Sequence, residues 1–106
     1  MTLDNSKVDE LQKEIAKKYL YDLGYTEITN VNKSLVYIGK GDGMKTTQVY
    51  CKLTNVDNTE CWTIDEYLEN NLQEFATSNI KLIRLEGIIH NNYNVTDFHP
   101  RILKDL

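Results

Sequence analysis

The sequence predicts a single α+β domain over residues 1–106, with a mostly antiparallel sheet and helices packed on one face. Three observations lead to this class. Apolar residues at three- and four-residue steps near the N-terminus predict a helix, alternating residues in the middle predict strands, and a capping motif at Thr63 predicts a second helix. The expected order is therefore helix, three strands, helix, strand and a short C-terminal helix.

The first helix is predicted from Asp4 to Leu23. Its apolar residues recur at helical spacing and form one stripe, made of Val8, Leu11, Ile15, Tyr19 and Leu23. Gly24 fits the left-handed position that follows many helices, where Tyr25 can contact Leu20 in a Schellman-type stop. The helix is thus expected to end at a defined residue.

Three strands are predicted next, over Thr26 to Val31, Ser34 to Ile38 and Lys45 to Leu53. In the third, Thr47, Val49, Cys51 and Leu53 share one face, and Gln48, Tyr50 and Lys52 share the other. The glycine-rich segment of residues 39–43 lacks the Gly-Lys-Ser/Thr and the following helix that a phosphate-binding loop needs. It is therefore predicted to be a hairpin turn.

A second helix is predicted from Ile64 to about Thr77. Thr63 and Glu66 form a capping box, and Trp62 precedes it in the position of a hydrophobic staple. A long buried strand is predicted from Ile80 to His90, because this segment is rich in β-forming residues. Pro100 is compatible with the first turn of a short closing helix over Pro100 to Leu106.

No cofactor and no metal site are expected. The candidate zinc ligands are Cys51, Cys61, His90 and His99, and neither pair has the short spacing with which one loop holds zinc. No serine lies in a nucleophile motif, so we expect the protein not to be an enzyme. A dyad of Cys61 with a histidine stays open, because such groups assemble in space.

The polar N-terminus and the absence of a long apolar run in the sequence predict a cytoplasmic protein without a membrane partner. Only two of its twelve basic residues are arginines, Arg84 and Arg101. Arginine is the preferred residue for bidentate recognition of phosphates and bases, so this shortage argues against direct nucleic-acid binding.

The net charge of −4 is unevenly distributed. Residues 53–80 contain six acidic side chains and no lysine or arginine, whereas the rest of the chain is slightly basic. Much of this charge falls on the predicted second helix, and the simpler explanation is a solvated helix face whose first-turn acidic residues favour the helix dipole. The alternative is a docking surface for a basic protein partner, formed by Glu60, Trp62, Asp65, Glu66, Glu69 and Gln73.

The leading hypothesis is a small non-enzymatic protein-binding module. Inhibitors of nucleic-acid-binding enzymes from phages or mobile elements fit this description. Self-association through an exposed strand edge, giving a homo-oligomer, is a further alternative.

The expected element order also resembles the core of restriction-endonuclease-like nucleases, and residues 13–25 resemble their first helix and turn. Residues 49–52 fall where that family carries Glu-x-Lys on its third strand. Lys52 matches the lysine, but Tyr50 stands in place of the carboxylate and the second strand has no acidic residue. The resemblance implies a catalytically inactive nuclease-like or other nucleic-acid-associated domain, which is the alternative function.

Overall fold

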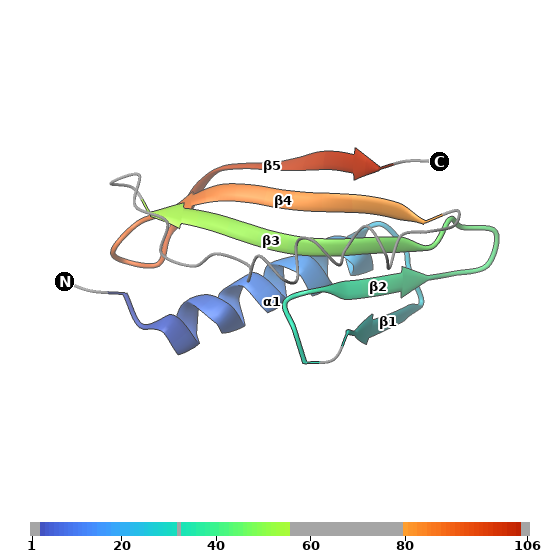
Figure 1. Cartoon of the computed structure of the whole chain (residues 1–106), viewed down its shortest axis with the longest axis horizontal. Coiled ribbons are helices and arrows are strands. Elements are labelled where there is room, and N and C mark those ends of the chain that lie inside the picture. Colours follow the sequence, from blue (N-terminus) through green and yellow to red (C-terminus); the bar gives the residue numbers. More distant parts are fainter. Residues whose placement is uncertain (1–2, 32, 56–79, 105–106) are drawn as a thin grey trace.

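The computed structural model describes residues 3–31, 33–55 and 80–104. These residues form one helix, α1 (Asn5–Asp22), and a five-stranded sheet (Figure 1). The sheet has the strand order β1-β2-β3-β4-β5. Its strands are β1 (Glu27–Asn30), β2 (Tyr37–Lys40), β3 (Thr47–Asn55), β4 (Lys81–Ile89) and β5 (Val95–Lys104). The predicted α+β class is confirmed.

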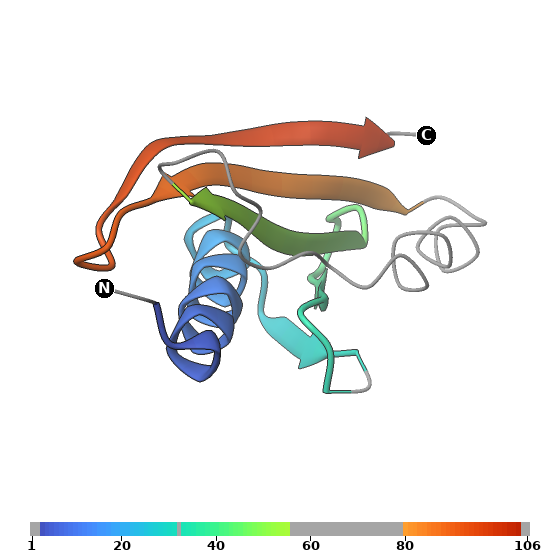
Figure 2. The same cartoon turned by 60° about the vertical axis from the view of Figure 1, so that its left-hand side comes forward.

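The sheet is mixed. β1 pairs with β2, β2 with β3 and β4 with β5 in antiparallel fashion, whereas β3 and β4 are parallel along their whole length. Figures 1 and 2 show α1 on one face of the sheet, where it packs mainly against β3. The sheet is thus mostly antiparallel, as predicted, and the β3–β4 pair is the exception among these strands.

Both ends of α1 are capped, and the C-terminal stop is the one expected from the sequence. The Asp4 carboxylate accepts a hydrogen bond from the Ser6 backbone N–H at 2.9 Å. At the other end, the Tyr25 N–H donates to the Leu20 carbonyl at 3.2 Å, and Gly24 adopts a positive φ of 97°. These features confirm the predicted Schellman stop.

The buried face of α1 differs from the predicted apolar stripe. The most buried side chains are spaced four residues apart and comprise Val8, Gln12, Ala16 and Leu20. Leu11, Ile15 and Tyr19 pack beside this row and are only partly buried. Leu23 is the C-cap and is 47% exposed, so the prediction that it faces the core is wrong. The predicted stripe considered apolar residues alone, and the buried row of α1 contains the polar Gln12. The buried face of the helix was therefore misplaced.

The main core lies between α1 and the sheet. It includes the predicted alternating face of β3 and the matching face of β4, namely Val49, Cys51, Leu53, Ile83, Leu85 and Ile89. The opposite face of the sheet also has a small apolar cluster, in which Tyr50 and Leu82 pack with Val36. Side chains on both faces of β3 are therefore buried.

The predicted C-terminal helix over Pro100 to Leu106 is wrong, because the described part of this segment belongs to strand β5. Pro100 lies opposite Leu85 on a strand at the edge of the sheet. Proline is tolerated on an edge strand because its missing N–H costs no hydrogen bond on the open side. The same proline is acceptable at a helix start, so the sequence pattern did not distinguish the two.

The second strand begins and ends later than predicted, at Tyr37 and Lys40 instead of Ser34 and Ile38. Gly39 belongs to this strand and not to the turn. A Cβ atom on Gly39 would lie 2.9 Å from side-chain atoms of both Leu20 and Tyr25, so close packing against α1 requires glycine here. The predicted hairpin between the second and third strands is confirmed.

The predicted second helix lies in residues 56–79, outside the described residues. Within the described ranges, no helix is long and apolar enough to cross a membrane.

Candidate functional site

The predicted partner-binding residues Glu60, Trp62, Asp65, Glu66, Glu69 and Gln73 all lie outside the described residues, as does Cys61. Their arrangement is therefore a prediction from the sequence. The described residues present two other surfaces on β4 and β5, which occupy one side of the sheet (Figure 1).

The first surface is apolar and lies on the outer strand β5. We define the β5 patch as four exposed residues of this strand, Phe98, Pro100, Ile102 and Leu103. Phe98 is 46% exposed, Ile102 57% and Leu103 41%. Because α1 packs mainly against β3, the helix leaves this outer strand open.

The pairing of β5 with β4 is irregular at two places, and one of them lies between Leu82 and Ile83. The pairing of β4 with β5 shifts between Glu86 and Ile88, where Asp97 takes a positive φ of 53°. Gly87 lies within this β-bulge, and a Cβ there would come within 2.9 Å of Val95 Cγ1. A bulge and a proline both hinder the pairing of an edge with another strand. The outer edge is therefore better suited to contacts through side chains than to strand addition.

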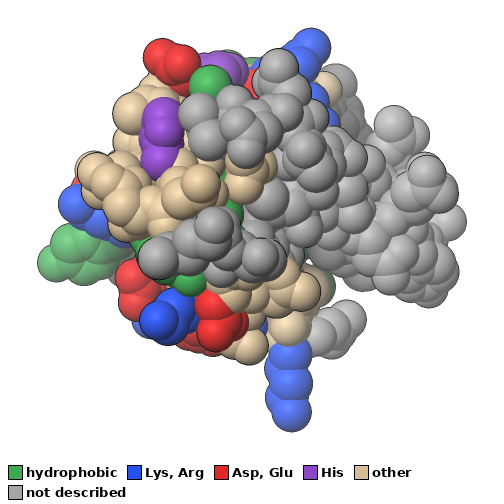
Figure 3. Space-filling model, turned by 90° about the vertical axis from the view of Figure 1, so that its left-hand side faces the viewer, with side chains coloured by type: hydrophobic (Ala, Val, Ile, Leu, Met, Phe, Trp, Pro, Cys, Tyr) green, Lys and Arg blue, Asp and Glu red, His purple; other side chains and the backbone are tan. Residues whose placement is uncertain are grey.

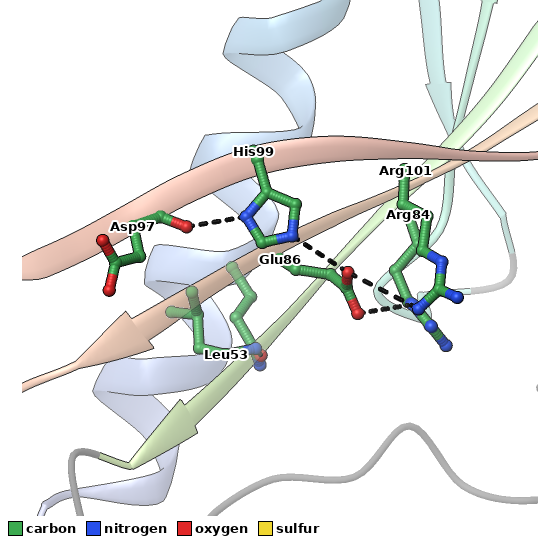
Figure 4. Close-up of polar contacts among 7 residues, drawn as sticks. Leu53, Arg84, Glu86, Asp97, His99 and Arg101 are labelled. Carbon is green, nitrogen blue, oxygen red and sulfur yellow. Dashed lines mark hydrogen bonds and ion pairs between the residues drawn. The ribbon is translucent and has the colours of Figure 1, made fainter.

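The second surface is charged and lies on the sheet face away from α1. We define the charged cluster as Arg84, Glu86, His99 and Arg101 (Figure 4). The Glu86 carboxylate lies 3.2 Å from Arg84 Nε and 3.1 Å from His99 Nε2. Its distance to the Arg101 guanidinium is 3.9 Å. Figure 3 looks onto the end of the molecule shown on the left in Figure 1, and at its top acidic and histidine side chains lie next to one another.

Both ring nitrogens of His99 lie at hydrogen-bond distance from an oxygen atom. His99 Nδ1 lies 2.8 Å from the Asp97 carbonyl oxygen, which can only accept a hydrogen bond. His99 Nε2 faces the Glu86 carboxylate, another acceptor when ionised. The contact with Glu86 is an ion pair when His99 is protonated.

The two arginines of the chain are direct cross-strand partners. Arg84 on β4 lies opposite Arg101 on β5, and Glu86 lies opposite His99 in the same strand pair. This pairing was not predicted, because residues 100–106 were expected to form a helix and no strand was expected over residues 91–99. The alternation in β4 already placed Arg84 and Glu86 on one face, so a correct strand assignment for β5 would have revealed the cluster.

The register also places Lys52 of β3 beside Glu86 of β4. Lys52, which matches the lysine of the nuclease motif, is therefore next to a glutamate of the neighbouring strand. Tyr50, which stands in place of the motif's carboxylate, is buried and only 1% exposed. In residues 3–31, 33–55 and 80–104, no three or more histidine, cysteine or acidic side chains gather as a metal site would require.

The sheet separates two of the four candidate zinc ligands. Cys51 is a free thiol in the core on the α1 side, whereas His99 lies on the opposite face. Burial raises the pKa of the Cys51 thiol from 9.0 to about 12. His90 Nε2 lies 2.8 Å from Thr96 Oγ1. Cys51 is therefore a core residue, which agrees with the interpretation of its strand position.

No family model, no curated protein and no solved structure matches this chain.

Proposed function

We propose that the protein is a small binding module that docks a partner protein on the β5 patch. The observation that carries this proposal is the concentration of exposed apolar side chains on one outer strand. Of the five large apolar residues exposed in the described ranges, Phe98, Ile102 and Leu103 lie on β5. Contiguous exposed apolar surface is typical of protein interaction sites, and these three residues lie within six positions of one strand.

The composition of the patch supports a protein partner. It contains the aromatic side chain of Phe98 beside aliphatic ones, and aromatic residues are enriched at protein interfaces. Complete burial of one such apolar side chain contributes roughly 1.5–3 kcal/mol. Truncating two of them should weaken binding about 100-fold or more, since each 1.4 kcal/mol is a factor of ten.

A second docking surface is proposed from the concentration of acidic residues in positions 53–80. It consists of Glu60, Asp65, Glu66 and Glu69. A basic protein partner would bind there. The double variant Glu66→Lys, Glu69→Lys tests this surface, because charge reversal should weaken capture of that partner strongly. Unchanged binding would exclude the acidic surface.

The β5 patch is tested by affinity capture from the native host with a matched pair of double variants. Phe98→Ser, Ile102→Ser removes apolar anchors from β5. Tyr21→Ser, Leu23→Ser removes two exposed apolar residues at the end of α1. We expect the first variant to lose the captured partner and the second to retain it, with circular dichroism confirming that both fold. Equal capture by both variants would contradict docking on β5.

A further inference from the structure

We propose that the start of α1 and the turn between β4 and β5 form a clasp, whose two halves open and close together. We define the clasp as Asp4 and Lys7 on the helix side and Tyr93 on the turn side. Asp4 is the N-cap of α1, and Tyr93 lies 89 positions further along the chain. Figures 1 and 2 show both segments at the same end of the molecule.

Tyr93 has a backbone conformation that a tyrosine rarely adopts. Its φ is 67°, in the left-handed region that favours glycine and asparagine. Two backbone hydrogen bonds close the turn around it, from the Tyr93 N–H to the His90 carbonyl and from the His90 N–H to the Asn94 carbonyl, both at 2.8 Å. Glycine or asparagine would adopt this φ without strain. The tyrosine therefore strains the turn, and contacts elsewhere must balance that strain.

The side chain of Tyr93 makes these contacts with the start of α1. Its hydroxyl oxygen accepts a hydrogen bond from the Asp4 backbone N–H at 2.9 Å. The N–H of an N-cap residue has no acceptor among the backbone carbonyls of its own helix, so Tyr93 supplies one. Lys7 Nζ lies 5.7 Å from the centroid of the Tyr93 ring, within the range of a cation–π contact. The ring also packs against the main core.

Each half of the clasp depends on the other. Without the helix, Tyr93 keeps its unfavourable φ and loses the contacts that balance it. Without the turn, the Asp4 N–H loses its acceptor, directly beside the buried side chain of Leu3. Local openings of proteins take place in cooperative units. The two halves therefore form one such unit, although they are far apart in the sequence.

Closure of the clasp determines two features of this end of the molecule. A groove of about 390 Å³ lies between the halves, lined by residues of α1 such as Leu11 and Glu14 and by Tyr93. Opening removes the Tyr93 wall of this groove. The strand β5, which carries the β5 patch, begins at Val95, two residues after Tyr93. The clasp thus also fixes the start of β5.

Amide hydrogen exchange of the full chain, measured by NMR, tests the coupling. The reporters are the N–H of Val8, which donates to the Asp4 carbonyl at 3.0 Å, and the N–H of His90 in the turn. Tyr93→Phe removes only the hydroxyl group, so exchange should accelerate about threefold to tenfold at both reporters. Tyr21→Phe removes the hydroxyl group of an exposed tyrosine near the other end of α1 and should change neither rate. An unchanged rate at either reporter in Tyr93→Phe, or equal acceleration in Tyr21→Phe, would overturn the clasp.

The variant Tyr93→Asn tests the strain in the turn. Asparagine tolerates a left-handed φ, so this substitution removes the strain together with the contacts to α1. We expect exchange at Val8 to accelerate more than exchange at His90, because relief of strain compensates only at the turn. Equal acceleration at the two reporters would overturn the strain in the turn. Circular dichroism checks that each variant keeps the fold, and the test of coupling stands on Tyr93→Phe, which keeps the ring in place.

Discussion

Oε1 of Gln12 on α1 accepts a hydrogen bond from the backbone N–H of Leu53 in β3, at a donor–acceptor distance of 3.0 Å. The pairing of β2 with β3 ends at Val49, so β3 continues beyond its neighbour on that side. Gln12 supplies there an acceptor that a strand would otherwise provide. Both residues are fully buried, so this contact attaches the helix to the sheet at a point shielded from water.

Replacing Gln12 with alanine should destabilise the protein by about 2–3 kcal/mol. The variant leaves the Leu53 N–H without its acceptor and removes buried side-chain volume. Urea unfolding monitored by circular dichroism measures the effect. Lys13→Ala is a suitable control, because its long, partly exposed ion pair with Glu10 should contribute less than about 1 kcal/mol. Equal stability of the two variants would contradict the role given to Gln12.

The variant Gln12→Glu keeps an acceptor oxygen but introduces a group that can ionise in the core. Burial favours the neutral carboxyl and raises its pKa in the folded state. The destabilisation relative to the wild type should therefore be small below about pH 4 and grow as the pH rises above the unfolded pKa of about 4.3. Unfolding curves of both proteins at pH 3.5 and pH 7 test this difference. A penalty that does not depend on pH would contradict the buried position.

Gly39→Ala should cost about 1–3 kcal/mol, because the new methyl group would overlap with Leu20 and Tyr25. The matched variant is Gly41→Ala, where the close atom is Sδ at the flexible end of Met44. We expect the latter to change the thermal midpoint little. Similar midpoints for the two variants would mean that α1 can move away from β2 without cost.

Cys51 should be unreactive toward thiol reagents in the folded protein. Its pKa of about 12 leaves almost no thiolate at pH 8, and the side chain is inaccessible. In the variant Cys61→Ser, labelling with a thiol-specific disulfide reagent should occur only after unfolding in guanidinium chloride. Rapid labelling of this variant under native conditions would contradict the core position of Cys51.

The same thiol should make stability depend on alkaline pH. Above about pH 9 the unfolded state loses the Cys51 proton, whereas the folded state retains it up to about pH 12. The unfolded state then binds fewer protons, so the free energy of unfolding falls as the pH rises through this range. Cys51→Ala should lose that part of the slope, which urea unfolding at pH 8 and pH 10 would measure.

Self-association through the β5 edge should be weak in the wild type, because Pro100 and the bulge at Asp97 interrupt the edge. Pro100→Val restores a backbone N–H and a β-forming side chain at the centre of the strand. We expect this variant to associate more strongly than the wild type in sedimentation equilibrium. Identical molecular masses over the same concentration range would show that Pro100 does not protect the edge.

The local features of the fold were predictable where neighbouring residues determine them. The stop of α1 at Gly24 and Tyr25 depends on short-range hydrogen bonds, and the buried face of β3 follows from alternation. The ending of the chain was not predictable in the same way. Pro100 suits both a helix start and an edge strand, and only the pairing with Leu85 distinguishes them.

The charged cluster was missed for a related reason. Arg84 and Arg101 are 17 positions apart in the sequence and meet only through the register of β4 with β5. Their small number argued against phosphate recognition when the composition was considered alone. Their adjacency appears only in the folded chain, where β4 pairs with β5.

The parallel pairing of β3 with β4 has a consequence for folding. Thr47 pairs with Lys81 and Asn55 with Ile89, so every partner lies 34 positions further along the chain. The β2–β3 hairpin and the β4–β5 hairpin involve much shorter separations and can form first. Closing the long loop between them is the entropically costly step. Substitutions in β3 and β4 that weaken this central pairing should slow folding, whereas those in β1 or at the end of β5 should mainly accelerate unfolding.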